Sequence, residues 1–496
     1  MENFGCRAAR ADGEAVGDRL RGAGLGELEP AVADVVVVNT CSVTAEADRA
    51  ARAFIRKAHR LNPEAKIVVT GCYAQRAPEE LAKLAGVAAV VGNSHKGLAP
   101  EIILGLAGGG APVTNSGLIQ IEAATSRGRA TSEQLAPPQV VWADDRFAHS
   151  FLEEAQVVPG AQTRPNLKIQ EGCGNRCTFC VIPQTRGGSK SLTAASVLRQ
   201  VEGFVAAGGN ELVLSGINLG RWGRDLAKAS ISTLLPEERQ KDGAPAKSPE
   251  TLAGLMGEIF ARTALPWLRL SSIEPMDWDA ELIGLMAEFG GRRLARHAHL
   301  PLQSGSDAVL RRMHRRYRPW HYADKVAALV RAAGPELTLG ADVMAGFPGE
   351  TDAEFEETVA LIEALPFGYL HLFPFSPRPG TPGWALHRER PVPAAVVDER
   401  MTALRALAAK KSTAHRENMM GRTLNAITLN APAEVAARDC SVALTENFLP
   451  VELAGRVEAN RLIVVHVNGL RADGTLLAMR TNEALNSSSC NEAVAV

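Results

Sequence analysis

The sequence has no excess of charge of either sign and no long hydrophobic run. Its 496 residues include 54 Lys and Arg against 55 Asp and Glu, a formal net charge of -1. A protein that binds polyanions over its whole surface would be strongly basic, so any nucleic-acid site must be a local patch. No apolar stretch approaches the ~18 residues that span a bilayer, and the opening residues MENFGCRAARADGE lack the apolar core of a signal peptide. We therefore expect a cytoplasmic protein that does not bind membranes.

Cysteine is scarce, and its placement is uneven. Of the eight cysteines, three lie far apart near the amino terminus, three form a tight cluster and two come late. In a reducing cytoplasm, grouped thiols indicate a metal or a catalytic role rather than disulfides. The alternative for any single cysteine is a small buried hydrophobic side chain. The three sets are Cys6, Cys41 and Cys72; Cys173, Cys177 and Cys180; and Cys440 and Cys490, which receive no role.

The composition excludes disorder, collagen and a coiled coil, since 46% of the residues are apolar, and at ~150 residues per domain the length suggests about three domains. Residues 1–105 alternate β-branched runs with helical patterns. Strands are expected at 35–38 and 66–69, and helices at 45–61 and 78–84. This alternation is typical of parallel βαβ units, so we expect an α/β domain with a doubly wound parallel sheet.

A second alternating region, residues 164–400, predicts six βα units, which fit a full or partial β/α barrel. Its expected strands lie at 167–169, 211–215, 267–271, 297–300, 338–343 and 369–373. The remaining segments are a linker or insertion at 106–163, a surface insertion at 228–249, a small all-β barrel at 418–482 and a tail at 483–496.

The strongest motif is the C-x3-C-x2-C cluster of Cys173, Cys177 and Cys180, just after a predicted strand. Three soft thiolates around one centre favour zinc or an iron-sulfur cluster. Structural zinc would need a fourth ligand, and residues 181–190 contain no Cys, His, Asp or Glu. A [4Fe-4S] cluster with three protein ligands keeps one iron open, which a cofactor can chelate through an amine and a carboxylate. We expect such a catalytic cluster, with structural zinc as the alternative.

The three amino-terminal cysteines each follow a predicted strand. The carboxyl ends of parallel strands share one edge of a sheet, where ligand sites form. Cys6, Cys41 and Cys72, separated by 35 and 31 residues, can therefore converge on a second cluster. Three unrelated buried cysteines are the alternative. Only five residues precede Cys6, so we expect a first strand two or three residues short, and either a mis-assigned start or a loosely held Cys6.

The cysteine motifs resemble those of a known family. The C-x3-C-x2-C motif with residues 181–187 (VIPQTRG) resembles the radical S-adenosylmethionine (SAM) superfamily, in which a reduced [4Fe-4S] cluster binds SAM and cleaves it to a 5′-deoxyadenosyl radical. Residues 3–6 (NFGC), 37–44 (VVNTCSVT) and 69–75 (VTGCYAQ) resemble the methylthiotransferase family, whose amino-terminal domain carries an auxiliary [4Fe-4S] cluster. The resemblance covers nearly the whole chain and implies a TRAM-type β-barrel at its end.

The resemblance also implies an activity. Methylthiotransferases insert sulfur and a methyl group at an unactivated C–H bond, which requires a radical because acid-base and nucleophilic catalysis are inadequate. One SAM supplies the methyl group and another the radical, while the auxiliary cluster presents an activated, methylated sulfur. The implied partners are tRNA and a reducing electron donor such as flavodoxin or ferredoxin, and the sulfur donor stays open.

Family members act on an adenosine beside the tRNA anticodon that carries isopentenyl or threonylcarbamoyl, or on an aspartate of a ribosomal protein. Residues 300–307 (LPLQSGSD), 315–317 (RRY) and 3–7 (NFGCR) look most like the threonylcarbamoyladenosine branch. We therefore expect 2-methylthiolation of N6-threonylcarbamoyladenosine at position 37 of tRNA, with the isopentenyladenosine and protein-modifying branches as alternatives. A redox-sensing, RNA-binding iron-sulfur protein is the non-enzymatic rival, which the intact C-x3-C-x2-C motif disfavours.

Several family-like segments at predicted strand ends are expected to line the SAM and substrate pocket. Residues 208–211 (GGNE) resemble the glycine-rich segment that meets the SAM amino group, although a Gly pair is by itself an ordinary turn. The expected cofactor-binding residues are Gly208, Gly209, Glu211, Ser271, Glu274, Gln303, Ser304 and Asp342.

An arginine-rich run at 311–318 (RRMHRRYR) is the expected RNA-binding patch, because guanidinium groups hold phosphate and an aromatic ring stacks on a base. A solvated helix end with salt bridges is the alternative. The candidates are Arg311, Arg312, Arg315, Arg316, Tyr317 and Arg318. Residues 421–480 hold six Arg and six acidic residues, so the carboxyl-terminal barrel is neutral and a weak RNA anchor unless one face concentrates its arginines.

Overall fold

A computed structural model describes residues 1–108, 140–145, 147, 152, 164–226 and 251–481. The chain forms two compact units. The first consists of residues 1–156, 171–175 and 180–189, and the second of 157–170, 176–179 and 190–496. The amino-terminal domain predicted at 1–105 therefore also takes in two short segments around the C-x3-C-x2-C motif. The predicted insertion at 228–249, the tail, Cys490 and most of the predicted linker lie outside the described residues.

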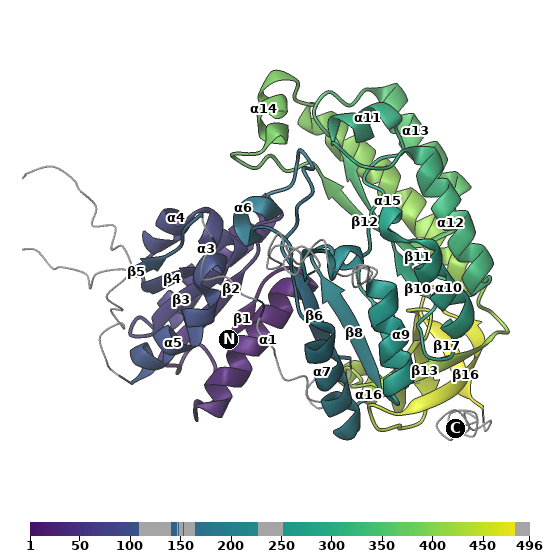
Figure 1. The fold of residues 1–496 in the computed structure, drawn as a ribbon, viewed down its shortest axis with the longest axis horizontal. Coiled ribbons are helices and arrows are strands. Elements are labelled where there is room, and N and C mark those ends of the chain that lie inside the picture. Colours follow the sequence, from purple (N-terminus) through teal and green to yellow (C-terminus); the bar gives the residue numbers. More distant parts are fainter. Residues whose placement is uncertain (109–139, 146, 148–151, 153–163, 227–250, 482–496) are drawn as a thin grey trace, which may run out of the picture. The chain divides into compact units, whose positions relative to one another are not determined.

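The first unit is built on a parallel sheet with the strand order β1-β2-β3-β4-β5 (Figure 1). Its strands are β1 (Glu2–Asn3), β2 (Val35–Thr40), β3 (Lys66–Gly71), β4 (Val87–Gly92) and β5 (Val140–Trp142). Its helices are α1 (Arg7–Gly22), α2 (Ala45–Leu61), α3 (Cys72–Arg76), α4 (Pro78–Ala82), η1 (Asn93–Leu98), α5 (Ala99–Ala107) and α6 (Ile182–Arg186).

Both faces of this sheet are covered by helices, as predicted. Val36 and Val38 of β2 pack with α2, α3 and α4, whereas the intervening Val37 packs with α1 and α5. The all-buried β-branched strands follow from this two-sided cover. Helix α2 begins where the sequence predicts, because the side chain of Thr44 accepts a hydrogen bond from the Ala47 amide. The predicted helix at 78–84 is correct in place but is preceded by a separate turn of helix, α3.

The second unit contains the predicted six parallel strands of a partial β/α barrel. Strands β6, β8 and β9 form one sheet, with β7 at its edge, and β10, β11 and β12 form another. Backbone bonds between Leu268 of β9 and residues 293–295 link the two sheets. The strands are β6 (Asn166–Glu171), β7 (Lys190–Ser191), β8 (Glu211–Gly216), β9 (Trp267–Leu270), β10 (His297–His299), β11 (Thr338–Ala345) and β12 (Phe367–Pro374).

Helices alternate with these strands and precede the carboxyl-terminal module. They are α7 (Ala194–Ala206), η2 (Leu219–Arg221), α9 (Leu252–Arg262), η3 (Pro275–Asp277), α10 (Ala280–Phe289), α11 (Asp307–Arg312), α12 (Pro319–Ala333), α13 (Asp352–Ala364), α14 (Pro382–Glu389) and α15 (Ala394–Glu417). Within the described part of the chain, no helix combines the length and the apolar character needed to cross a membrane.

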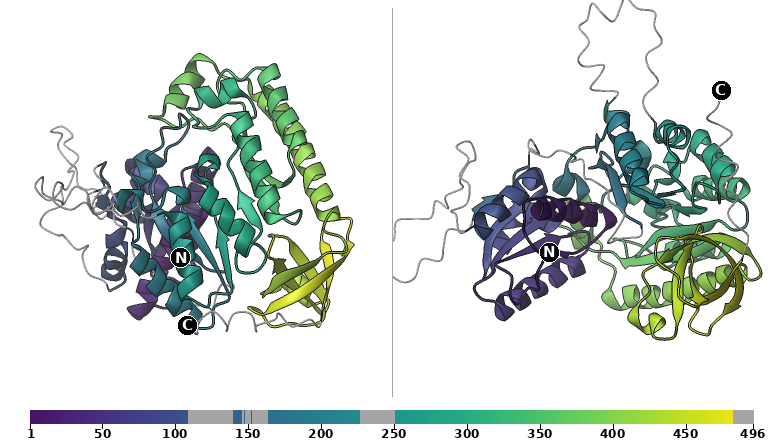
Figure 2. Two further views of the ribbon diagram at one scale, coloured as in Figure 1. Left: turned by 45° about the vertical axis from the view of Figure 1, so that its right-hand side comes forward. Right: turned by 90° about the horizontal axis from the view of Figure 1, so that it is seen from below.

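The carboxyl-terminal module is the predicted small β-barrel, closed in the order β13-β14-β15-β17-β16 and drawn in yellow in Figure 2. Its elements are β13 (Thr423–Leu429), α16 (Ala433–Ala436), β14 (Cys440–Thr445), β15 (Pro450–Ala454), β16 (Leu462–Leu470) and β17 (Leu476–Arg480). Trp267, at the start of β9, packs against Ile427 and Leu444 of this barrel. The barrel therefore closes the amino-terminal ends of the core strands.

A buried arginine reinforces this closure. Arg269 of β9 is fully buried and pairs through Nε with Glu211 of β8 at 2.6 Å. Its two terminal nitrogens donate to the backbone carbonyls of Glu446 and Thr445, which follow and end β14, at 3.2 and 3.3 Å. The guanidinium thus joins two core strands to the terminal barrel.

Candidate functional site

The three amino-terminal cysteines lie at one edge of the first unit's sheet. Cys6 follows β1, Cys41 follows β2 directly, and Cys72 is the first residue after β3. The register pairs Asn3 with Asn39 and Thr40 with Gly71, so the strand ends are level. Cys41 and Cys72 are buried and Cys6 is exposed.

The electrostatics of Cys41 indicate that the three sulfurs are close neighbours. Burial, followed by the nearby Cys72 and Cys6, raises the pKa of the Cys41 thiol to about 12, against the opposing effect of backbone hydrogen bonds from Val43 and Cys6. Without a cation, the Cys41 thiol therefore stays protonated. A metal centre relieves this repulsion and takes the sulfurs as thiolates, so the group fits an iron-sulfur cluster.

Glycine at position 5 allows Cys6 to approach the other two. Gly5 has a φ of +109°, and a Cβ built there would lie 2.2 Å from Cys41 Cβ and 2.7 Å from its sulfur. A larger residue would be strained and would also displace Cys41. The short amino-terminal strand is thus sufficient to bring the Cys6 turn against Cys41.

Arg186 of α6 lies beside Cys72. Its Nε is 3.2 Å from the Cys72 sulfur, and its Nη1 contacts Asp12 at 2.8 Å and Glu171 at 2.6 Å. Lys96 pairs with the same two carboxylates. Burial alone would lower the pKa of Arg186, but the surrounding negative groups hold it well above its usual range. The guanidinium therefore stays charged although it is 1% exposed.

One nitrogen of the Arg186 guanidinium makes no hydrogen bond to any described residue. Nη2 of Arg186 is buried and has no hydrogen-bond partner among the described residues. Asn93 adds a second donor to Cys72, since its Nδ2 lies 3.4 Å from the sulfur. An iron-sulfur cluster held by Cys72 would offer sulfide acceptors to such donors, which is a second sign that the residues present fit the group.

The C-x3-C-x2-C loop contributes to both units. In the first unit, the backbone N–H of Cys173 donates to Gly187 O at 3.1 Å, and the Asn175 N–H lies 3.4 Å from the Cys173 sulfur. Cys180 belongs to the same unit, whereas Cys177 belongs to the second. All three thiols are partly exposed. That they bind one cluster stays a prediction.

Arg315 supports Cys177 within the second unit. Its Nη1 lies 3.3 Å from the Cys177 sulfur, and its Nη2 pairs with Glu274 at 2.6 Å. The Cζ of Arg315 lies 4.9 Å from the ring centroid of Tyr317. The Tyr317 hydroxyl donates to the backbone carbonyls of Pro301 and Leu302. Glu274, predicted to bind cofactor, is therefore linked to Cys177 through one arginine.

The other predicted pocket residues that follow core strands differ in what their side chains do. Ser271 comes directly after β9, and its buried hydroxyl has no hydrogen-bond partner among the described residues. Gln303 follows β10 and adopts a φ of +65°. Ser304 is fully buried and bonds to Thr358 of α13 at 3.0 Å, so it fixes its own loop. Asp342 lies in β11 between two histidines.

The interpretation of residues 208–211 is wrong. Gly208 and Gly209 precede β8, so they lie at the amino-terminal ends of the core strands, opposite the ends where Ser271 and Gln303 lie. Gly208 O accepts a hydrogen bond from Asn460 of the terminal barrel at 3.2 Å. Glu211 is fully buried and pairs with Arg269. The glycines form a turn at the end of the core strands opposite the predicted pocket, and the Glu211 carboxylate is paired with Arg269.

The arginine run at 311–318 also needs correction. Arg315 and Tyr317 are buried, so they do not present an RNA-binding surface. Arg312 forms an ion pair with Glu354, while Arg311 and Arg318 share Asp307. The exposed members are Arg311 and Arg316. The RNA-binding prediction therefore narrows to these two, with Arg318 beside them.

Sequence reasoning missed Arg186, Asn93 and the two histidines around Asp342. Arg186 stands inside the quoted segment VIPQTRG, so the motif contained it without revealing its partner. His299 ends β10 in the sequence HAH, and His371 lies within β12 in the sequence LHL, so a pairing between strands rather than one local motif brings them together.

Comparison with known proteins agrees with this geometry. Residues 167–362 match the radical SAM superfamily, and residues 1–92 match a family described as uncharacterised protein family UPF0004. The radical SAM match implies a [4Fe-4S] cluster and SAM. The fold and the strand-end thiols therefore define a radical SAM enzyme.

Curated relatives are more specific. The threonylcarbamoyladenosine tRNA methylthiotransferase MtaB of Bacillus subtilis is 33% identical over 459 residues, which cover 92% of this chain and 90% of the relative. MtaB of Aquifex aeolicus is 32% identical over 469 residues, 94% of this chain and 98% of the relative. The tRNA-2-methylthio-N(6)-dimethylallyladenosine synthase of Erythrobacter litoralis is 32% identical over 431 residues, 85% of this chain and 84% of the relative. This chain belongs to the methylthiotransferase family of radical SAM enzymes.

Proposed function

We propose that this enzyme converts N6-threonylcarbamoyladenosine at position 37 of tRNA to its 2-methylthio derivative. In this proposal Cys173, Cys177 and Cys180 hold the SAM-binding [4Fe-4S] cluster, and Cys6, Cys41 and Cys72 hold an auxiliary one. The observation that carries it is the set of strand-end thiols in the first unit, with Arg186 and Asn93 donating to Cys72. A metal-free role would not need three thiols gathered at one sheet edge, two of them buried, beside a buried guanidinium nitrogen with no hydrogen-bond partner among the described residues.

The protein groups have separate tasks in this reaction. The SAM cluster supplies a 5′-deoxyadenosyl radical when it is reduced, and the auxiliary cluster supplies the sulfur. Arg315 holds Cys177 and Glu274 in place, and Arg186 stabilises negative charge on Cys72. The electron donor belongs to the same proposal, and dithionite can replace a flavodoxin or ferredoxin in the assay.

The substrate assignment rests on the relatives' printed activities and on segments 300–307 and 315–317. A second candidate is N6-dimethylallyladenosine, because a synthase acting on it is almost as similar to this chain. The two bases differ chemically: threonylcarbamoyl carries a carboxylate and a hydroxyl, and dimethylallyl is apolar.

The decisive experiment is nucleoside mass spectrometry of tRNA from a deletion strain. The proposal predicts loss of 2-methylthio-N6-threonylcarbamoyladenosine and accumulation of its unthiolated precursor. Re-expression of the wild type restores the product, and re-expression of Cys177→Ala does not. Unchanged threonylcarbamoyladenosine thiolation, with loss of the dimethylallyl product instead, would select the second candidate.

Anaerobic reconstitution separates the enzyme from a redox-sensing RNA-binding protein. Protein with both clusters, dithionite and SAM should release 5′-deoxyadenosine. Absence of 5′-deoxyadenosine from protein with a full complement of iron would favour the sensor.

A further inference from the structure

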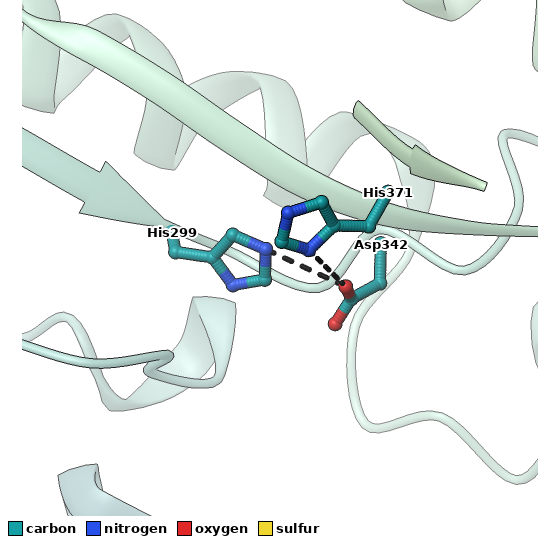
Figure 3. A group of neighbouring side chains, drawn as sticks. All are labelled: His299, Asp342 and His371. Carbon is teal, nitrogen blue, oxygen red and sulfur yellow. Dashed lines mark ion pairs between the residues drawn. The ribbon is translucent and has the colours of Figure 1, made fainter. Parts of the chain in front are cut away.

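Three adjacent strands of the barrel direct metal-ligating side chains at one point. His299 ends β10, Asp342 lies in β11 and His371 lies in β12, and the register pairs Asp342 directly with His371 (Figure 3). One nitrogen from each histidine and one oxygen from Asp342 lie within 4.8 Å of one another. All three residues belong to the second unit, and none of them is a cysteine of either set.

The spacing suits a shared ion better than direct hydrogen bonds. Asp342 Oδ1 is 3.5 Å from His299 Nε2 and 3.4 Å from His371 Nδ1. Good N–H···O hydrogen bonds measure about 2.7–3.2 Å, so both contacts are long. Ligands bound to one ion at ~2.1 Å in tetrahedral geometry lie ~3.4 Å apart. The two distances between Asp342 Oδ1 and the histidine nitrogens match that value.

The orientation of His299 supplies a second, independent observation. Its Nδ1 lies 2.9 Å from the hydroxyl of Ser272, which fixes the ring. Its Nε2 then faces Asp342 and has no hydrogen-bond partner among the described residues, although His299 is only 7% exposed. A ligating histidine is usually held through its other nitrogen in this way.

Charge and access agree with this arrangement. Asp342 is a short carboxylate whose Oδ1 lies between the two imidazoles, so it offers a hard oxygen donor beside two nitrogen donors. The side chain of His371 is 55% exposed. An ion here would therefore have one protected side and one side open to an oxygen ligand or to water.

We propose that His299, Asp342 and His371 bind one divalent first-row transition-metal ion through two nitrogens and one oxygen, with further coordination positions open. Two histidines and one carboxylate with open positions form a donor set typical of iron(II), manganese(II) and zinc(II). The site stands independently of which tRNA base the enzyme modifies.

The test uses Mn²⁺, because manganese competes poorly for thiolates. Tag-free holoenzyme with both clusters oxidised is stripped of loose metal and titrated with Mn²⁺, and the free ion is followed by room-temperature electron paramagnetic resonance. We expect one site per chain, and at least about tenfold weaker binding in Asp342→Asn and His371→Ala. His321→Ala removes an exposed histidine of the same unit and should bind like the wild type.

Pulsed electron paramagnetic resonance of the bound Mn²⁺ provides a second readout, and its first result comes from the wild type alone. The wild type should show ¹⁴N coupling from imidazole, which His371→Ala reduces while keeping its iron content. Absence of a stoichiometric site, absence of ¹⁴N coupling, or equal affinity in Asp342→Asn and the wild type would overturn the proposal and leave two ordinary histidine-aspartate ion pairs.

Discussion

The Nε of Arg186 lies 3.2 Å from the sulfur of Cys72, although the two residues are 114 positions apart. Arg186 ends the short helix that follows the C-x3-C-x2-C motif, and Cys72 is the third of the amino-terminal cysteines. The polypeptide that follows the C-x3-C-x2-C motif therefore passes directly beside the site proposed for the auxiliary cluster. One buried cation thus serves a cysteine of that site and two carboxylates at once.

Removing this cation should damage the first unit. We expect Arg186→Gln to destabilise the unit by about 3–5 kcal/mol, because Asp12 and Glu171 lose a buried partner. The same variant should lose up to half of the bound iron if Cys72 can no longer hold its cluster. Iron analysis and thermal unfolding measure the two effects. Arg56→Gln, an exposed change on α2, is the matched control, and equal behaviour of the two variants would contradict the role of Arg186.

The two cysteine sets should separate two activities. Cys41→Ala is expected to retain reductive SAM cleavage and to abolish methylthiolation, because the auxiliary cluster proposed for this cysteine would supply only the sulfur. Cys177→Ala should abolish both, because without the radical no C–H bond is broken. Release of 5′-deoxyadenosine and mass spectrometry of the tRNA product report them independently. Loss of SAM cleavage in Cys41→Ala, with the remaining cluster intact, would refute this division.

RNA binding should depend on the exposed arginines of the 311–318 run. Reversing the charge of Arg311 and Arg316 together should weaken tRNA binding and reduce the slope of log affinity against log salt by about 2, one for each lost phosphate contact. Fluorescence anisotropy with labelled tRNA at several salt concentrations measures both. Arg405→Glu reverses an exposed charge on α15 and serves as the control. A salt slope equal to that of this control would place the RNA site elsewhere.

A buried histidine should make stability depend on pH. His415 of α15 lies 2.7 Å from the Thr338 hydroxyl, and burial lowers its pKa from 6.5 to about 4. Because the folded-state pKa is the lower one, the stabilisation is complete above about pH 6.5 and is lost as pH falls toward 4.

We therefore expect His415 to lower the free energy of unfolding of the wild type by about 1 kcal/mol when the pH falls from 7.5 to 5.8. The His415→Gln variant should not show this contribution. Urea unfolding followed by tryptophan fluorescence at the two pH values tests this difference. His321→Gln, which alters an exposed histidine, should keep the wild-type dependence. The same pH change in His415→Gln and the wild type would exclude His415 as its source.

The sequence was most informative where one local pattern decides the structure. The runs of β2 and β3 predicted buried parallel strands, and Thr44 marked the start of α2, because β-branching and helix capping act over a few residues. The cysteine positions could be placed at strand ends for the same reason.

Other features depend on distant partners and were misjudged. Residues 208–211 resemble a SAM-binding glycine segment, but they precede β8 and so lie at the amino-terminal end of a core strand, where residues 208 and 210 contact Asn460, 250 or more residues away. Arg315 and Tyr317 read as surface groups in an arginine-rich run, but Glu274 and Cys177 draw the guanidinium inward. Charge patterning alone does not distinguish a solvated arginine from a paired buried one.

The guanidinium of Arg269 changes how the carboxyl-terminal barrel should be regarded. The Arg269 side chain reaches from a core strand to backbone carbonyls at the end of β14. The barrel is therefore packed against the enzyme core and is part of its structure rather than a separate domain on a flexible linker. A chain cut at residue 420 would leave the Arg269–Glu211 pair without those carbonyls and Trp267 without its apolar cover. The shortened protein would therefore not be the same catalyst minus an RNA module, and activity lost on truncation would not by itself measure RNA binding.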